Sequence, residues 1–349
     1  MARPPLAVPA KSRPGDGVSV VSPSWGGPGV FPAVHERGMR VLRDELGLVP
    51  VEYPTTRRSD ASPQERAADL MAAFIDPRTT AIMATIGGDD QLTVLPYLDA
   101  DVVREHPKAF FGYSDNTNLL NWLWNQGIVG YHGGSTMVHL ARPMAVHPVS
   151  LASLRAALFT HGEVEITPVR TFTDVNCDWA DPATLDADLP QTAEPGWHWH
   201  NADRVVAGRT WGGNLEILHW NLAANRWIRP IEEYAGLVLV LETSEELPSS
   251  TSVLRMLRNM GERGLLQQFP ALVVAKPKAW ALDVRLDEAA RAEFRAAQRD
   301  AVLQVLADYH PTAMAVFGPD FGHTDPQYVL PYGGQITVDG PARRITVDY

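Results

Sequence analysis

Residues 109–117 read Ala-Phe-Phe-Gly-Tyr-Ser-Asp-Asn-Thr, and this stretch decides the fold. The apolar residues of its first half are typical of a buried strand, and residues 115–125 are expected to form a helix. A strand that runs through a glycine and a serine directly into a helix makes a sharp turn, which exposes the serine oxygen. The pattern therefore predicts that Ser114 lies at the carboxyl end of a strand in an α/β fold.

Similar strand and helix patterns alternate through the first half of the chain. Residues 18–22 and 81–86 are short apolar runs, and residues 34–46 have apolar side chains at helical spacing. Another helix is expected to begin at Ser62, because Ser-Pro-Gln-Glu forms a capping box with proline in the first turn. Strands that alternate with helices predict a doubly wound, mostly parallel sheet for residues 17–164.

The second half predicts a further domain over residues 211–349. Its expected elements are the strands 235–241, 271–275 and 313–318, the helices 250–265 and 287–309, and a final hairpin over 335–349 with its turn at Asp339-Gly340. Residues 165–210 hold three tryptophans, several prolines and little periodicity, which indicates a long, aromatic-rich connecting loop. Residues 1–16 are expected to form a flexible tail.

The composition excludes several classes of protein. The 349 residues are enough for two domains, and 41 acidic against 30 basic side chains give a formal net charge of -11. This negative charge repels a phosphate backbone, so no nucleic-acid partner is expected. The single cysteine, Cys177, excludes an internal disulfide and a cysteine zinc cluster. Without a signal-peptide pattern or an apolar run of about 20 residues, the chain is expected to be cytoplasmic, with no membrane partner.

Ser114 and its neighbours carry the strongest chemical signal. The hydroxyl is a candidate nucleophile, and the backbone N–H of Asp115 would point at the same space as an oxyanion donor. Gly88 is the natural second donor, because the strand before it and the strand before Ser114 are expected to end at one crevice of the sheet. The alternative is that Ser114 only caps the helix, a position that serine favours, and that the glycine pair is an ordinary turn.

A serine nucleophile needs a base, and His323 is the candidate. It lies in a loop rich in glycine, aspartate and proline just after a predicted strand, where catalytic side chains often lie. Glu242 ends the most apolar strand of the second domain and could orient the imidazole. His132 is the rival base, although its position soon after the serine helix fits a structural or substrate-contacting role better. A solvent-exposed histidine and an ordinary acidic loop are the alternatives.

Taken in order, these motifs resemble those of the LD-carboxypeptidase family of serine peptidases, which includes the microcin C immunity peptidases. The series comprises Gly87-Gly88, Gly112-Tyr113-Ser114-Asp115, Gly212-Gly213-Asn214-Leu215, the strand that ends in Glu242, and Gly322-His323. The resemblance spans residues 17–345, and the order and spacing of the motifs make it specific.

The resemblance implies a role for each matching residue. Ser114 matches the nucleophile, His323 the general base and Glu242 the acidic member of the triad. The amides of Gly88 and Asp115 match the oxyanion hole. The family fold implies an N-terminal α/β domain that bears the serine, a C-terminal β-rich domain that supplies the other two residues, and an active site between them. The resemblance also implies a homodimer that needs no metal and no cofactor.

Two stretches resemble the immunity-peptidase branch of the family. Residues 86–90 (Ile-Gly-Gly-Asp-Asp) are like that branch, whereas murein-recycling members more often carry an arginine before the glycine pair. Residues 195–215 are also similar, and in that branch the inserted loop holds aromatic residues that stack on a nucleobase. The candidates for contact with the substrate are Asp89, Asp90, Trp179, Trp197 and Trp199. The tryptophans expected in the core are Trp122, Trp124 and Trp211.

The sequence thus predicts a serine peptidase or amidase that forms an acyl-enzyme, with an aminoacyl- or peptidyl-nucleotide as substrate. One alternative is an LD-carboxypeptidase that removes terminal D-alanine from a murein tetrapeptide. Another is a non-catalytic small-molecule binding protein on the same scaffold. An α/β-hydrolase esterase is disfavoured, because its elbow requires glycine where Asn116 stands. The rate of hydrolysis is expected to rise with pH as His323 loses its proton, with a midpoint at a pH of about 6–7.

Overall fold

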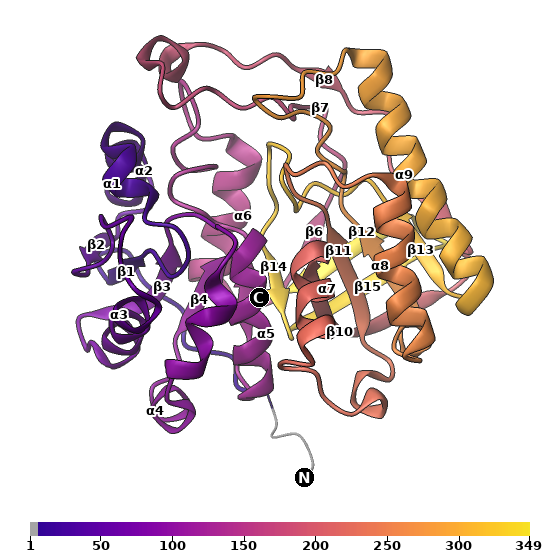
Figure 1. The fold of residues 1–349 in the computed structure, drawn as a ribbon, viewed down its shortest axis with the longest axis horizontal. Coiled ribbons are helices and arrows are strands. Elements are labelled where there is room, and N and C mark those ends of the chain that lie inside the picture. Colours follow the sequence, from indigo (N-terminus) through magenta and orange to yellow (C-terminus); the bar gives the residue numbers. More distant parts are fainter. Residues whose placement is uncertain (1–5) are drawn as a thin grey trace.

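The computed structural model describes residues 6–349 as two lobes that lie side by side (Figure 1). The strands of the N-terminal lobe are β1 (Gly17–Val21), β2 (Val49–Glu52), β3 (Thr79–Ala84), β4 (Ala109–Gly112), β5 (Gly130–His132) and β14 (Leu330–Tyr332). They form one sheet in the order β14-β5-β4-β3-β1-β2, in which β1 to β5 are parallel and β14 is antiparallel. The predicted doubly wound, mostly parallel sheet is therefore confirmed.

Local sequence signals explain where the helices of this lobe begin. These helices are α1 (Gly27–Val30), α2 (Pro32–Asp44), α3 (Pro63–Ile75), α4 (Ala100–Glu105), α5 (Thr117–Asn125) and α6 (Pro148–Phe159). Helix α3 begins at the predicted capping box, in which the Ser62 side chain accepts from the N–H of Glu65 and Glu65 Oε2 accepts from the N–H of Ser62 at 2.8 Å. Strands β1, β3 and β4 are neighbours, so their carboxyl ends share one edge of the sheet.

The C-terminal lobe is built on an eight-stranded sheet with a parallel centre and antiparallel edges. Its strands, in spatial order, are β6 (Glu163–Ile166), β16 (Arg344–Asp348), β15 (Gln335–Asp339), β10 (Val205–Asn214), β11 (Val238–Glu242), β12 (Ala271–Val274), β13 (Met314–Phe317) and β9 (His198–His200). Helices α8 (Ser250–Glu262) and α9 (Glu288–Tyr309) lie at the right of Figure 1, and α7 (Leu215–Ala224) lies nearer its centre, on the side of α5. None of the described helices is long and apolar enough to cross a membrane. The prediction of a second, strand-rich α/β domain is confirmed.

Each lobe contains a strand from the other half of the chain. Strand β6 crosses the predicted end of the N-terminal domain at residue 164 but pairs with β16, and β14 comes from the C-terminal half but pairs with β5. Residues 165–210, predicted as a loop, contain β9 and the first part of β10, with the short pair β7 (Thr171–Phe172) and β8 (Thr192–Ala193). Strand β10 begins with Val205-Val206 but contains three glycines after them, so pairing with β11 and β15 specifies the strand more than its local pattern does.

The N-terminal segment differs from the predicted flexible tail over residues 1–16. From residue 6 onward it lies against the N-terminal lobe, where backbone hydrogen bonds join Ala7 to residues 127 and 129. Lys11 Nζ donates a hydrogen bond to the hydroxyl of Tyr131 at 2.7 Å. These bonds hold residues 6–16 in place, and residues 1–5 lie outside the described residues.

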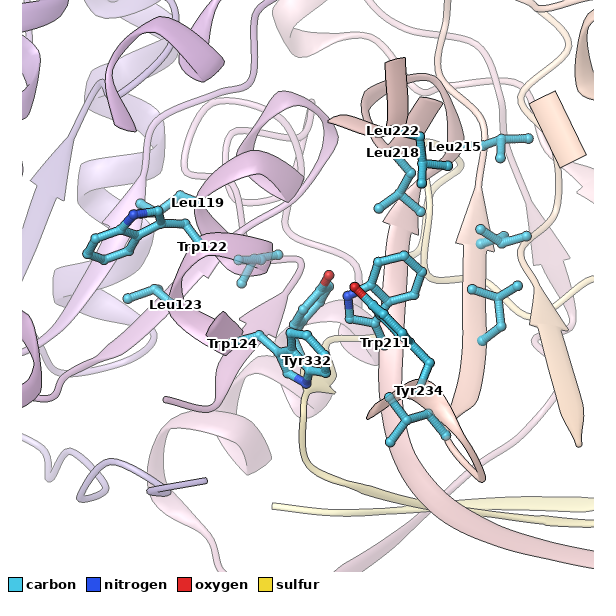
Figure 2. Packing of buried hydrophobic residues seen from close by; sticks show 14 of the residues in the cluster. Leu119, Trp122, Leu123, Trp124, Trp211, Leu215, Leu218, Leu222, Tyr234 and Tyr332 are labelled. Carbon is cyan, nitrogen blue, oxygen red and sulfur yellow. The ribbon is translucent and has the colours of Figure 1, made fainter. Parts of the chain in front are cut away.

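An aromatic junction joins the two lobes (Figure 2). Helix α5 contributes Trp124 and strand β10 contributes Trp211, and both side chains are fully buried, as predicted. The ring of Tyr234 stacks on Trp124 with centroids 5.4 Å apart and meets Trp211 edge to face at 4.8 Å. At the nearby end of β10, the N–H of Asn214 donates to Thr117 Oγ1 at 3.0 Å. These contacts hold the C-terminal lobe against the helix that follows Ser114.

The burial of the aromatic junction predicts that Trp211 contributes more to the stability of the fold than an exposed tryptophan does. Trp211→Ala would empty a buried site, so we expect the free energy of unfolding, measured by urea titration with circular dichroism, to fall by about 3–5 kcal/mol. The matched control is Trp220→Ala on α7, where the side chain is 37% exposed and the expected change is within about 0.5 kcal/mol. An equal loss in both variants would contradict the role given to the junction.

Candidate active site between the two lobes

Ser114 stands on a strained turn between β4 and α5. Its φ angle is 61°, in the left-handed region that costs a non-glycine residue about 1–3 kcal/mol. Tyr113 takes the cap position of the 3-10 helix Ser114–Asn116, so the interpretation of Ser114 as a simple helix cap is wrong. Ser114 is partly exposed, although the residues on either side of it are buried. The turn therefore presents one hydroxyl at the end of a buried strand.

The carboxylate of Asp115 holds this turn in place. It accepts hydrogen bonds from Ser24 Oγ at 2.6 Å, from the N–H of Gln91 at 3.0 Å and from Asn118 Nδ2 at 2.8 Å. The side chain is fully buried, and this burial raises the pKa of Asp115 above the usual aspartate value even though the hydrogen bonds oppose the shift. Three donors from different segments thus anchor the residue directly after Ser114.

The Gly87-Gly88 turn lies directly beside the serine. A Cβ atom on Gly87 would lie 2.9 Å from Ser114 Oγ and 3.4 Å from the backbone nitrogen of Asp115. A Cβ atom on Gly88 would lie 3.0 Å from Ser24 Cβ. Both glycines line the same cleft as Ser114. The turn proposed to supply an oxyanion donor is therefore next to the hydroxyl, and a side chain at position 87 would obstruct it.

His323 and Glu242 form a hydrogen-bonded pair beside the same cleft. Glu242 is the last residue of β11 and is buried, and His323 lies in the loop after β13. The distance between His323 Nδ1 and Glu242 Oε2 is 2.5 Å. Gly322 allows this close approach, because a Cβ atom on it would lie 2.9 Å from Glu242 Cβ. The ring of His323 meets that of Tyr113 at 4.9 Å, so the imidazole lies next to the residue before Ser114.

A second carboxylate engages the other nitrogen of His323. Glu245 Oε2 lies 3.0 Å from His323 Nε2. Burial alone would lower the pKa of His323, but the two carboxylates outweigh burial and raise this pKa to about 10. A pKa raised in this way shifts the expected midpoint of the rate above the range of about 6–7 for an ordinary imidazole. In the sequence, Glu245 stands out only as an acidic residue shortly after a strand end.

The cleft between the lobes has a volume of about 520 Å³ and is lined by both Ser114 and His323. Part of its wall is aromatic: Trp179 meets Phe31 edge to face with ring centroids 5.5 Å apart, and Phe31 meets Trp25 at 6.1 Å. The segment between β7 and β8, to which Trp179 belongs, crosses the top of the view in Figure 1. An irregular segment therefore contributes an aromatic face to the cleft.

The two other loop tryptophans lie away from this cleft. Trp199 belongs to β9, which pairs with β13 at the edge of the C-terminal sheet, and the rings of Trp197 and Trp199 are 6.4 Å apart. Neither is among the residues that line the cleft, whereas Trp179 is. The structure thus separates two of the three candidate stacking residues from the serine, because strand pairing draws them to the sheet edge.

Two further candidates also have different surroundings. Asp89 lines the cleft, but the carboxylate of Asp90 pairs with the buried guanidinium of Arg66, with Oδ2 2.6 Å from Nη2. The rival base, His132, is fully buried and meets Tyr113 with ring centroids 6.0 Å apart. Burial lowers the pKa of His132 to about 4. His132 is therefore a neutral core histidine that does not line the cleft.

Lys278 is a buried residue at the cleft that was not among the predicted site residues. Its Nζ donates to Asn176 Oδ1 at 2.9 Å and to the carbonyl oxygen of His323 at 3.3 Å. Burial lowers the pKa of Lys278 to about 8, although nearby carboxylates oppose the shift. The residue lies in an irregular stretch after β12, where no periodicity or motif marks it.

Two family models match the chain. The LD-carboxypeptidase N-terminal domain matches residues 18–133, and the LD-carboxypeptidase C-terminal domain matches residues 207–338. A putative carboxypeptidase of Vibrio cholerae is 27% identical over 331 residues, covering 93% of this chain and 92% of the relative. The microcin C7 self-immunity protein MccF of Escherichia coli is 24% identical over 287 residues, covering 81% and 78%. A probable murein peptide carboxypeptidase of Bacillus subtilis is 26% identical over 288 residues, covering 81% and 76%.

Solved structures share the fold over nearly the whole chain. MccF in complex with glutamyl sulfamoyl guanosine gives a TM-score of 0.82 at 23% identity and covers 98% of both chains. An MccF-like protein from Streptococcus pneumoniae in complex with AMP gives a TM-score of 0.82 at 25% identity, covering 96% of this chain and 99% of the other.

The position of Gly87 predicts how a small substitution acts on the serine. Gly87→Ala would place a methyl group against Ser114 Oγ, so we expect the rate of labelling by a fluorophosphonate probe to fall by about tenfold to a hundredfold. Ser114→Ala provides the background, and the melting temperature of each variant shows whether the fold is retained. Labelling of folded Gly87→Ala at the wild-type rate would contradict the proximity of this turn to the reactive oxygen.

Proposed function

Because the chain belongs to the LD-carboxypeptidase family of peptidases, we propose that it hydrolyses an amide bond with Ser114, His323 and Glu242 as a catalytic triad. The observation that carries this proposal is the left-handed turn at Ser114, which lines the same cleft as His323 of the hydrogen-bonded pair with Glu242. Such strain persists only where the surrounding structure enforces it. Exposure of a hydroxyl in the cleft that His323 also lines accounts for that strain.

In the proposed reaction, His323 Nε2 takes the proton of Ser114 as Oγ bonds to the carbonyl carbon of the substrate. The N–H groups of Gly88 and Asp115 stabilise the oxyanion. The bond from carbon to the leaving nitrogen then breaks, and that nitrogen receives the proton from His323. Water next adds its oxygen to the acyl carbon while His323 takes its proton, and this proton returns to Ser114 as the acid leaves. Glu242 orients the imidazole and stabilises its charged form.

The proposed substrate is an aminoacyl- or peptidyl-nucleotide. The aromatic wall of Trp25, Phe31 and Trp179 supports this choice, because every nucleobase has a face that can stack on an aromatic ring. The relative MccF is named as a microcin C7 self-immunity protein, and the MccF-like protein of Streptococcus pneumoniae was solved with AMP. A cleft of about 520 Å³ is within the usual range for a site that binds a small ligand.

A murein tetrapeptide is the alternative substrate, and the name of the Bacillus subtilis relative supports it. Such a peptide has no base to stack, so the aromatic wall favours the nucleotide. A non-catalytic binding protein would have no use for the strain at Ser114, which disfavours that function. The homodimer and the cytoplasmic location stay predictions.

The proposed function is tested by parallel hydrolysis of two substrates. We expect the wild type to hydrolyse an aminoacyl sulfamoyl adenosine and Ser114→Ala to lose at least about a thousandfold in kcat, as expected when a triad member is removed. Chromatography of the released nucleoside measures the first reaction, and release of D-alanine measures hydrolysis of a murein tetrapeptide. Release of D-alanine alone would establish the murein tetrapeptide as the substrate. Activity that survives in Ser114→Ala would contradict a mechanism with Ser114 as the nucleophile.

The aromatic wall generates a separate expectation about binding. Base stacking is worth about 1–3 kcal/mol, so Trp179→Ala should weaken binding of AMP by about 5- to 150-fold in calorimetry. Trp199→Ala is the matched control, because it removes the same side chain from a residue outside the cleft. Equal affinity in the wild type and Trp179→Ala would exclude Trp179 as the stacking residue.

A further inference from the structure

The imidazole of His323 has both of its nitrogens engaged by carboxylates. Glu242 Oε2 lies 2.5 Å from Nδ1, and Glu245 Oε2 lies 3.0 Å from Nε2. In the mechanism proposed above, Nε2 has to accept the proton of Ser114. Glu245 therefore occupies the position from which catalysis would start, and the arrangement is that of a protonated imidazole between two anions.

The two carboxylates differ in their freedom to move. The side chain of Glu242 is fully buried, whereas the side chain of Glu245 is 55% exposed and lines the cleft with Ser114. An ion pair with an exposed partner is screened by water and is weak enough for a competing charge to displace it. Glu242 is thus the permanent partner of His323, and Glu245 is a partner that a ligand in the cleft could draw away.

Of the other groups around His323, Lys278 attracts Glu245 through its charge, but its hydrogen bonds go elsewhere. Burial lowers the pKa of both His132 and His139 to about 4, so these two rings are neutral near pH 7. Burial and the nearby carboxylates keep the hydroxyl of Tyr113 neutral by raising its pKa. Lys278 Nζ donates to Asn176 and to the carbonyl oxygen of His323.

Asp325, which follows in the same loop as His323, is committed elsewhere. Its Oδ2 pairs with Arg142 Nε at 2.6 Å. Among the described groups around the imidazole, the two glutamates therefore supply the negative charge in direct contact with its nitrogens.

We propose that Glu245 binds the free ammonium group of the substrate's acyl residue, and that this contact releases Nε2 of His323 to Ser114. The inference rests on the proposed function and adds a requirement to it. An α-amino nitrogen is two bonds from the carbonyl carbon that Ser114 attacks, so it reaches the cleft beside Nε2. Glu245 is then a specificity residue that recognises an unblocked amino group and a positioning residue that acts through His323.

This arrangement couples recognition to activation. A substrate with an ammonium group gains a charged hydrogen bond to Glu245 and at the same time frees the base. A substrate whose amino group is acylated carries no charge to draw Glu245 away, so His323 stays doubly paired. The structure thus predicts a preference for acyl donors with a free amine over the same donors with a blocked amine.

The preference is tested with alanyl sulfamoyl adenosine and its N-acetyl derivative. We expect the wild type to prefer the free amine by about tenfold or more in kcat/KM, since one charged hydrogen bond is lost with the acetyl group. In Glu245→Gln this preference should fall to within about threefold, whereas Glu246→Gln, a neighbouring exposed residue outside the cleft, should keep it. A preference that is unchanged in Glu245→Gln would overturn the inference.

A conservative variant separates recognition from folding. Glu245→Asp keeps the carboxylate and is expected to keep the preference for the free amine. Loss of the preference in both Glu245→Asp and Glu245→Gln would indicate a merely structural role and would overturn the inference. The melting temperature of every variant is measured alongside, and each is expected to match the wild type because the side chain is largely exposed.

A second measurement follows the protonation of His323 in the absence of substrate. A fluorophosphonate has no ammonium group, so its reaction with Ser114 in the wild type should rise with pH at an alkaline midpoint, as His323 loses its proton. Removal of one negative charge destabilises the imidazolium, so Glu245→Gln should lower the midpoint by about one pH unit or more. An identical midpoint in both proteins would overturn the inference while leaving the triad intact. Labelling that persists in Ser114→Ala would overturn the proposed function and the inference together.

Discussion

The candidate site depends on one constraint, which is that the carboxyl ends of strands from two different sheets meet at one cleft. Strand β4 leads into the turn at Ser114, and β11 ends at Glu242. The end of β10 sets the distance between them, because a Cβ atom on Gly213 would lie 2.7 Å from Thr117 Oγ1 and the N–H of Asn214 donates to that same oxygen. Since a close-packed interior deforms little, this contact holds both parts of the site in place.

The electrostatics of the site follow from burial among carboxyl groups. Burial and the negative charge of Glu242 raise the pKa of Glu216 to about 7. The N–H and Oγ of Ser244 donate to Glu216 at 2.8 Å and 2.7 Å, so this side chain has its own partners. Glu216 thus carries less negative charge than an ordinary glutamate, and Glu242 and Glu245 are the carboxylates in contact with His323. The contact of His323 with Glu245 differs, because the Glu245 side chain is 55% exposed and water screens the pair.

The segment between the lobes shows how a stretch without periodicity contributes to a site. Side-chain contacts hold it at several points: Arg37 pairs with Asp186 at 2.6 Å, and Lys276 Nζ lies 3.8 Å from the ring centre of Phe172 and also pairs with Glu194. In this segment, such side-chain contacts take the place of the backbone hydrogen bonds that hold neighbouring strands together. Tryptophans that look equivalent in the sequence take different positions: Trp179 lines the cleft, whereas the pairing of β9 with β13 draws Trp197 and Trp199 to a sheet edge.

The sequence by itself determined the strands that lead to Ser114 and Glu242, the capping box at Ser62, and the order of the motifs that mark the family. Each of these depends on residues that are close together in the chain, where propensity and spacing act directly. Only the tertiary structure decided that β6 and β14 pair with the opposite lobe and that Glu245 reaches the second nitrogen of His323. It also placed Lys278 at the cleft. The partners in these contacts are far apart in the chain, so no local pattern specifies them, and they meet only when the two sheets pack together.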